Sequence, residues 1–423
     1  MDYDFVMGQN FISDTVNQTL LFPPSLHAWL PDDHLARFVV DVVSALDLDS
    51  IYASYREKDG RGQSSYAPEM MVRVLLYGYA TGVYSSRKIE RRTLEDVAFR
   101  YLSGDQHPDH ATLAEFRKRH LTALAGLFTQ ALLLCAKAGL VKLGHVSIDG
   151  TKIRANASKH KAMSYKRMIE TEARLKQEIN VLLTAAEKAD SDEDAQYGKD
   201  RNGEELPDEL QRRESRLLKI REAKQAFEDE AREKAEQKLA EAEKKQAAQE
   251  EDRCAGKKKR GRKSAPPDPE KAKPADKDQR NFTDPESRIM PDGANKGCFL
   301  QAYNAQIAVD STAQVIVAAE VTQETNDKKQ LLPMVAEIAS GEAPADATAR
   351  EQMQHKLKTE SGHAVYKMRK VIVEPVFGQI KECRGFRRFS LRGKQNVRGE
   401  WRLVCAVSNL LKLFRSGWTL QTA

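Results

Sequence analysis

The chain has 423 residues, of which 40% are apolar and 31% charged, and its formal net charge is +6 at pH 7. This length allows two or three domains, and the positive charge favours a polyanionic partner. The five cysteines form no CxxC pair, which argues against a zinc site or a disulfide framework. No run of about 18 apolar residues predicts a membrane span, and the acidic start does not fit a signal peptide. We therefore expect a cytoplasmic protein with no membrane contact.

Residues 1–140 are predicted to form an all-α domain. Apolar residues recur there at three- and four-residue spacing, which is typical of amphipathic helices. Near the end of this region three cations follow one another: Arg117, Lys118 and Arg119. They have two interpretations, a solvated helix face or a contact with DNA phosphates.

The stretch GHVSIDGTKIRANASKHK, residues 144–161, predicts a strand that ends in an acid. Val146 and Ile148 alternate with polar residues, as in a half-buried strand, and we expect the strand to end at Asp149, before Gly150. Asp149 has two interpretations. It either initiates a turn, as Asp-Gly pairs often do, or is a carboxylate held at a strand end.

Residues 161–255 are rich in Lys, Glu, Ala, Arg and Gln, and apolar residues recur there about every seven positions. This pattern predicts two long helices that pack as an antiparallel hairpin. The basic, Pro-rich residues 256–281 are expected to form neither helix nor sheet, and to serve as a linker or as a tail that touches nucleic acid.

Two β-rich runs, QAYNAQIAVD and AQVIVAAEV, are separated by a short polar turn and predict a strand hairpin, with a helix from Asp327. These strands follow the Asp149 strand by more than 100 residues. We therefore predict a mixed α/β domain, formed by residues 141–160 and 282–423, that the helical hairpin interrupts.

The C-terminal segment is strongly basic. Between residues 367 and 402 there are eleven Lys or Arg and three Glu. The candidate nucleic-acid contacts are Lys370, Lys381, Arg384, Arg387, Arg388 and Arg392. Three interleaved aromatic residues either stack on bases or anchor a core: Phe386, Phe389 and Trp401.

Glu374 follows a β-branched run and precedes Pro375, which predicts a helix start. An acid at this position either complements the helix dipole or belongs to a site. The motifs VSIDGTKIRANAS, DPESRIM, YNAQIAVD, VTQETNDKKQL and VEPVFGQIKECRGFRRFSLRG resemble the DDE transposases of bacterial insertion sequences. In addition, four residues resemble the Tyr-Arg-Glu-Lys signature of these enzymes: Tyr366, Arg369, Glu374 and Lys381.

The resemblance implies a helical N-terminal domain that binds DNA, an RNase H-like catalytic domain, and cutting and joining of double-stranded DNA at the element's inverted repeats and target. It implies a homo-oligomer on DNA and a site for Mg²⁺ or Mn²⁺. Asp149 would supply the first acid and Glu374 the last, both as catalytic residues and metal ligands, because two divalent ions stabilise the attacking and leaving oxygens.

The sequence departs from this family where the second aspartate belongs. No apolar run ending in Asp lies between QLLPMVAEIAS and Glu374, so we predict an internal deletion and the loss of most or all transposition activity. Asp310, Asp327 and Asp346 are the alternatives, and the sequence favours none of them. Two other functions are open: a DNA-binding protein without catalysis that recognises the element's ends, and a coiled-coil scaffold.

Overall fold

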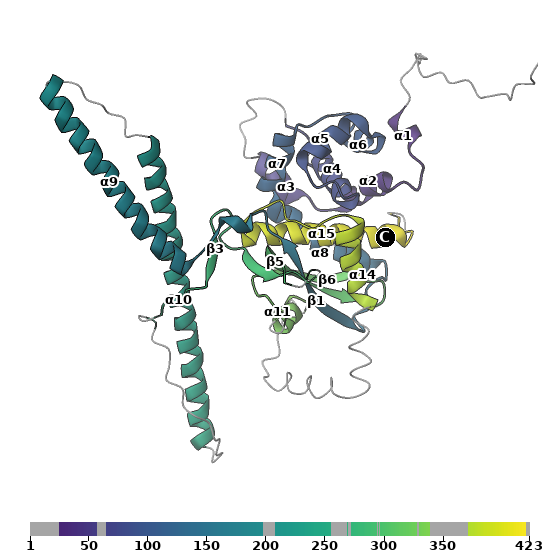
Figure 1. Ribbon diagram of the computed structural model, residues 1–423. Coiled ribbons are helices and arrows are strands. Elements are labelled where there is room, and N and C mark those ends of the chain that lie inside the picture. Colours follow the sequence, from purple (N-terminus) through teal and green to yellow (C-terminus); the bar gives the residue numbers. More distant parts are fainter. Residues whose placement is uncertain are drawn as a thin grey trace, which may run out of the picture.

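The computed structural model describes residues 25–56, 65–197, 208–254, 269, 272–293, 295, 297–327, 330–338 and 371–419. In Figure 1, N-terminal helices lie over a sheet and its covering helices, and a long arm of two helices projects to one side. Asp346 and Lys370 lie outside the described residues.

The N-terminal region is helical, as predicted. Its helices are α1 (Leu26–Trp29), α2 (Leu35–Ala45), α3 (Asp49–Arg56), α4 (Pro68–Ala80), α5 (Ser86–Glu95), α6 (Val97–Ser103), α7 (His110–Arg119) and α8 (Leu121–Lys137). Pro68 occupies the first turn of α4, where a missing N–H costs nothing. Gly104 ends α6 in the left-handed conformation. No single helix in the described ranges is long and apolar enough to cross a membrane, although α7 and α8, joined at a 70° bend, pass that test of length and composition as a pair.

The described residues form a four-stranded antiparallel sheet around β5 (Phe299–Asp310). One edge of β5 pairs with β1 (Val146–Arg154), and the other pairs with β6 (Ile316–Thr322) and β4 (Arg288–Pro291). The expected strand hairpin of β5 and β6 is thus confirmed, and the mixed α/β class with it.

Three expected boundaries are wrong. β1 continues past Asp149 to Arg154, because the β-branched Thr151 and Ile153 extend the strand and pair with β5. The expected linker ends in a short strand, β3 (Gln279–Asn281), which pairs with β2 (Ala162–Ser164) beside a 3₁₀ turn, η1 (Lys159–Lys161). Helix α11 (Leu331–Ile338) begins four residues after Asp327.

A single hydrophobic core joins the N-terminal helices to the sheet. Helix α15 (Lys394–Arg415) lies between α8 and the sheet, and its Gly399 allows close approach, because a Cβ there would lie 2.8 Å from Leu121 Cγ. The buried amide of Asn409 accepts from Ile316 N and donates to Ile316 O, both at 2.8 Å. The same core includes residues from Leu30 to Trp418, so the expected boundary near residue 140 does not separate two cores.

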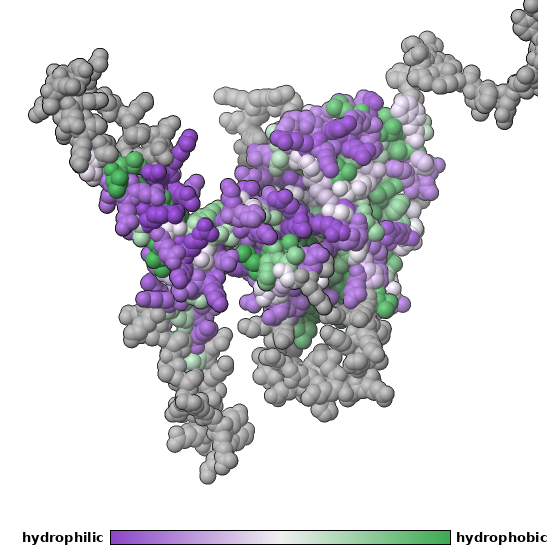
Figure 2. Space-filling view, in the orientation of Figure 1, coloured by the Kyte–Doolittle hydropathy of each residue, from purple (hydrophilic) through white to green (hydrophobic). Residues whose placement is uncertain are grey.

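The arm consists of α9 (Tyr165–Tyr197) and α10 (Asp208–Cys254). Tyr165 donates to Glu228, whereas Glu172, later in α9, accepts from Lys224, which is earlier in α10. The two helices therefore pack as an antiparallel hairpin. The buried residues between the helices include those of the seven-residue repeat: Met168, Leu175, Ile179, Leu217, Ile220 and Phe227. The described surface of the arm is otherwise mostly hydrophilic (Figure 2).

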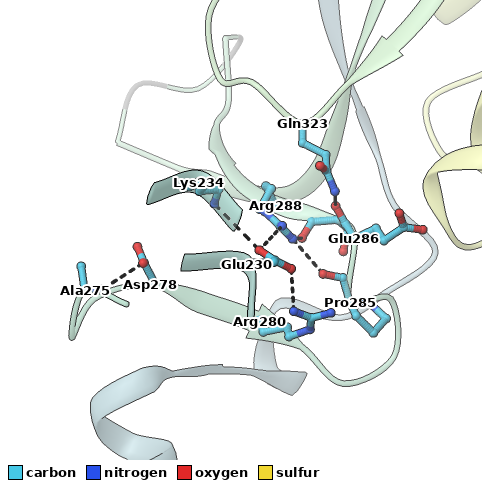
Figure 3. Close-up of polar contacts among 10 residues, drawn as sticks. Glu230, Lys234, Ala275, Asp278, Arg280, Pro285, Glu286, Arg288 and Gln323 are labelled. Atoms are coloured by element: carbon cyan, nitrogen blue, oxygen red, sulfur yellow. Dashed lines mark hydrogen bonds and ion pairs between the residues drawn. The ribbon is translucent and has the colours of Figure 1, made fainter. Parts of the chain in front are cut away.

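A charged cluster fixes the base of the arm to the sheet (Figure 3). Glu230 of α10 binds Arg280 of β3 at 2.7 Å and Arg288 of β4 at 3.4 Å. Arg280 also lies over the ring of Phe227, 5.7 Å from its centroid. Because one carboxylate bridges two strands, the arm is anchored at its base.

Candidate functional site

Asp149 lies in the middle of β1, on the face that packs against the main core. Its partner across the sheet is Ile307, which is buried in that core together with Ile153. Because alternate residues of a strand share a face, Asp149, Thr151 and Ile153 lie on one side of the sheet. The carboxylate is therefore carried by a paired strand, with its side chain half-buried.

Two contacts place Glu374 relative to β1. Gln314, in the β5–β6 turn beside the start of β1, donates to Val371 O at 3.0 Å. Ten residues later, Lys381 Nζ donates to Thr151 Oγ1 at 2.9 Å. The segment 371–381 is therefore fixed beside β1 at both ends, and Glu374 lies between these two contacts in the chain.

Glu374 is exposed at the start of a short helix, α14 (Glu374–Gly378), with Pro375 in its first turn, as predicted. A wider turn, η3 (Gln379–Cys383), follows directly, and Arg384 N bonds Gln379 O at 3.1 Å, five residues back. This turn carries Lys381 onto β1. Burial lowers the pKa of Lys381, assisted by Arg387.

The described residues do not complete a metal centre. Among them, no three His, Cys, Asp or Glu side chains lie close enough together to hold a metal ion. Asp310 is buried and accepts from Leu143 N at 2.7 Å and Thr312 N at 2.9 Å, so its carboxylate closes a turn. The described acids thus do not form a metal site on their own.

Asp327 lies on the other face of the sheet, over Gly150. Its Oδ1 accepts from Asn304 Nδ2 at 2.8 Å and from Gln306 Nε2 at 2.5 Å. A Cβ on Gly150 would lie 2.0 Å from Gln306 Nε2 and 2.4 Å from Asp327 Oδ1. The glycine after Asp149 is therefore required by side chains that cross the strand, and Asp327 faces away from Asp149.

Two of the candidate DNA contacts are wrong, because Arg117 and Arg384 are buried. Arg117 Nη1 donates to Tyr84 O at 2.9 Å, and Arg384 donates to Ser408 Oγ. Burial lowers the pKa of Arg384. Both guanidiniums lie where the N-terminal helices meet the C-terminal segment, and neither is accessible to DNA.

The three aromatic residues of the basic segment anchor the core. Phe386, Phe389 and Trp401 are at most 1% exposed, and Trp401 Nε1 donates to Gln306 O at 3.0 Å. The interpretation of base stacking is therefore wrong, whereas that of core anchors is confirmed. Burial of large rings is the common outcome for aromatics in a folded domain.

The remaining described candidates are exposed and differ in their partners. Lys118 and Arg119 end α7, and Arg119 pairs with Glu115 at 3.3 Å. Arg387 pairs with Glu382. Arg388 Nη2 and Arg392 Nε both donate to Asn156, to Oδ1 and to the backbone O respectively, each at 3.0 Å.

Sequence reasoning missed Thr151, Asn156 and Glu400 as parts of this region. Glu400 is fully buried and accepts from Ser390 N at 2.9 Å and Leu391 N at 3.1 Å, and burial raises its pKa. Their partners lie hundreds of residues away or on another element, so no local pattern identifies them. Asn156 had one local signal, a polar side chain two residues after the end of the strand.

Comparison with known families assigns both ends of the chain. Residues 24–119 match the family model of a transposase domain (DUF772), and residues 342–414 match that of a transposase DDE domain. The second range contains Glu374, Lys381 and Arg388, whereas Asp149 lies outside both. No curated protein and no solved structure matches the chain.

Proposed function

Because this chain belongs by its two matched domains to the DDE-type transposases of insertion sequences, we propose that it binds the ends of its element and has lost most or all of its cutting and joining activity. The binding partner is double-stranded DNA, at the inverted repeats and the target. The protein acts in the cytoplasm as a homo-oligomer on that DNA.

Asp149 and Glu374 are the proposed remnants of the catalytic site. The observation that carries this assignment is the hydrogen bond from Lys381 to Thr151, because it joins the turn after the Glu374 helix to the strand that contains Asp149. A bound Mg²⁺ or Mn²⁺ would supply charge stabilisation to the attacking and leaving oxygens of a phosphodiester. This chain's own contribution is to hold two carboxylates on a paired strand and at a helix start.

The proposed loss of activity rests on the missing second aspartate, since no apolar run that ends in Asp lies between QLLPMVAEIAS and Glu374. In an RNase H-like arrangement, the strand with the second aspartate pairs beside the strand with the first. Among the described residues, that edge of β1 has a strand-like partner at its end, where Arg154 pairs with Arg388. Arg154 N donates to Arg387 O at 3.2 Å, and Phe389 N to Arg154 O at 2.9 Å.

The alternative function is DNA binding without catalysis, at the same element ends. The exposed Arg388 and Arg392 favour it, because phosphate binding needs accessible cations rather than a complete acid set. A copy that binds ends without cutting them would compete with an active transposase.

Nicking of supercoiled plasmid DNA that carries the flanking element ends tests the proposal. The purified chain, Asp149→Asn and Glu374→Gln are compared with Mg²⁺ or Mn²⁺, and DNA binding is measured in parallel. We expect no metal-dependent nicking by any of the three, together with DNA binding that weakens as salt rises.

Metal-dependent nicking that both substitutions abolish would show that another acid completes the site, and would overturn the proposed loss of activity. Absence of salt-sensitive DNA binding by the unaltered chain would overturn the DNA-binding proposal itself.

A further inference from the structure

Several arginines of this protein are neutralised by carboxylates. Arg280 and Arg288 share Glu230 at the base of the arm (Figure 3), and Arg387 pairs with Glu382. Arg388 and Arg392 differ from them. Both are exposed, and within the described ranges neither forms an ion pair with a carboxylate.

A neutral side chain and its backbone hold these two arginines in place. Arg388 Nη2 donates to Asn156 Oδ1 at 3.0 Å, and Arg392 Nε donates to Asn156 O at 3.0 Å. An amide fixes the direction of a guanidinium without cancelling its charge, whereas a carboxylate does both. Two guanidiniums are therefore held by one residue without a carboxylate partner among the described residues, and the nearby carboxylates of Asp284 and Glu286 accept from the backbone of Gly393 and Lys394.

The loop between the two arginines is held from both sides. On one side Asn156 Nδ2 donates to Ser390 O at 2.7 Å, and on the other the buried Glu400 accepts from Ser390 N and Leu391 N. The backbone of Arg154 pairs with the chain just before the loop. Because the loop is already ordered, binding an anion there costs little conformational entropy.

We propose that Asn156 is a positioning residue that arranges Arg388 and Arg392 as a clamp for backbone phosphates of double-stranded DNA. This inference rests on the proposed function and deepens it, since it names a surface and a non-basic residue for the DNA contact. Guanidinium forks match phosphate oxygens in pairs, which suits two adjacent arginines.

The clamp has a defined place relative to the acids. Arg154 is five residues beyond Asp149 on β1, about 17 Å at the rise of an extended strand. The proposed clamp therefore lies past the C-terminal end of β1, away from Asp149 in mid-strand.

The test is the salt dependence of DNA binding by the full-length chain. Binding to a duplex of about 30 bp that carries the element end is measured by fluorescence anisotropy between about 50 and 200 mM salt. The variants are Arg388→Gln, Arg392→Gln and Asn156→Asp. The first two each remove one phosphate contact, and we expect each to lower the slope of log K against log salt by about 0.9. Asn156→Asp keeps both arginines in the sequence, adds a carboxylate beside them, and removes the Nδ2 donor to Ser390 O.

We expect Asn156→Asp to weaken binding and flatten the salt slope as the arginine variants do, because its charge neutralises the clamp. Two control variants make the same charge changes on the arm. Arg174→Gln removes an arginine that pairs with Glu178, and Asn180→Asp adds an acid to an exposed position. Both should bind DNA as the unaltered chain does. Circular dichroism verifies that every variant is folded.

The inference is overturned if the unaltered chain binds DNA with a steep salt dependence while Arg388→Gln, Arg392→Gln and Asn156→Asp keep its affinity and slope. Equal weakening by the two control variants would also overturn it, because the effect would then be one of net charge. If the unaltered chain shows no salt-dependent binding, the proposed function itself fails.

Discussion

At the scale of single residues, Gly150 shows how a side chain can be excluded by polar neighbours. Gln306, Asn304 and Asp327 meet over its Cα, and the first two are fully buried. We expect Gly150→Ala to displace these amides from Asp327 and to lower the free energy of unfolding by about 1–3 kcal/mol, as overpacking does. Urea denaturation followed by circular dichroism measures it.

Gly126→Ala is the matched control. Gly126 lies within α8, and a Cβ there would meet nothing within 4 Å. Alanine favours a helix over glycine by about 0.5–1 kcal/mol, so this variant should be neutral or more stable. Equal losses for both glycines would contradict the steric explanation.

The basic segment shows that residue type alone does not predict the role of an arginine. Arg384 is buried, Arg387 is neutralised by Glu382, and Arg388 is held by Asn156. The sequence predicted one role for all of them, because charge is visible in a sequence whereas burial and pairing depend on distant residues.

At the scale of elements, the arm depends on one carboxylate near its base. Glu172 of α9 binds Lys176 at 2.9 Å, Lys224 at 3.2 Å and Arg221 at 3.3 Å. Hydrogen bonds from Lys176, and then from Lys224, lower its pKa to about 2, from an ordinary value of 4.5. The folded arm therefore favours the ionised form of Glu172.

We expect Glu172→Gln to destabilise the arm by about 1–3 kcal/mol at pH 7, the range for hydrogen bonds to charged groups. A depressed pKa contributes stability above the unfolded value, near 4.5, and this contribution is lost as the pH falls towards 2. The difference between the two proteins should therefore shrink below pH 4.5. Hydrogen exchange of α9 amides at several pH values measures it.

Glu178→Gln is the control for this prediction. Glu178 also meets two arginines, at 3.6 Å and 3.5 Å, but its side chain is 38% exposed. Exposed ion pairs contribute about 0–1 kcal/mol, so this variant should differ little from the unaltered chain. A loss as large as that of Glu172→Gln would show that arm charge in general, rather than this cluster, is responsible.

At the scale of the whole molecule, the two matched transposase domains are packed against each other. Gly82 follows α4 with φ +79°, and a Cβ there would lie 2.6 Å from Arg384 O. Arg117 donates to Tyr84 O in the same region, and the ring of Tyr84 meets that of Phe386 at 5.0 Å. Both halves therefore share one interface, and we expect them to unfold together.

Gly82→Ala tests this coupling. A left-handed alanine costs about 1–2 kcal/mol, and the contact with Arg384 adds about 1–3 kcal/mol of overpacking. We expect a lower melting temperature with a single transition, measured by far-ultraviolet circular dichroism and by tryptophan fluorescence. Gly104→Ala separates the two effects, because Gly104 has φ +60° with nothing within 4 Å. It should show the backbone cost alone.

The sequence by itself determined the elements that depend on local periodicity. The N-terminal helices, the seven-residue repeat of the arm, the β5–β6 hairpin and the helix start at Glu374 follow from patterns within one element. The family motifs at the C-terminal end could also be recognised from the sequence, because a motif is defined by the types and spacing of its residues. Such features depend on neighbours within a few positions, so they can be predicted from the sequence alone.

The tertiary structure decided what depends on contacts between distant segments. The strand of Asp149 was expected to end there, but pairing with β5 extends it to Arg154. Arg117 and Arg384 are buried in the folded protein. Asn156 accepts hydrogen bonds from Arg388 and Arg392, which are more than 230 residues away in the chain. Long-range packing and hydrogen bonding choose between such alternatives, because burial and partner identity are set by the assembled core and have no local signal in the chain.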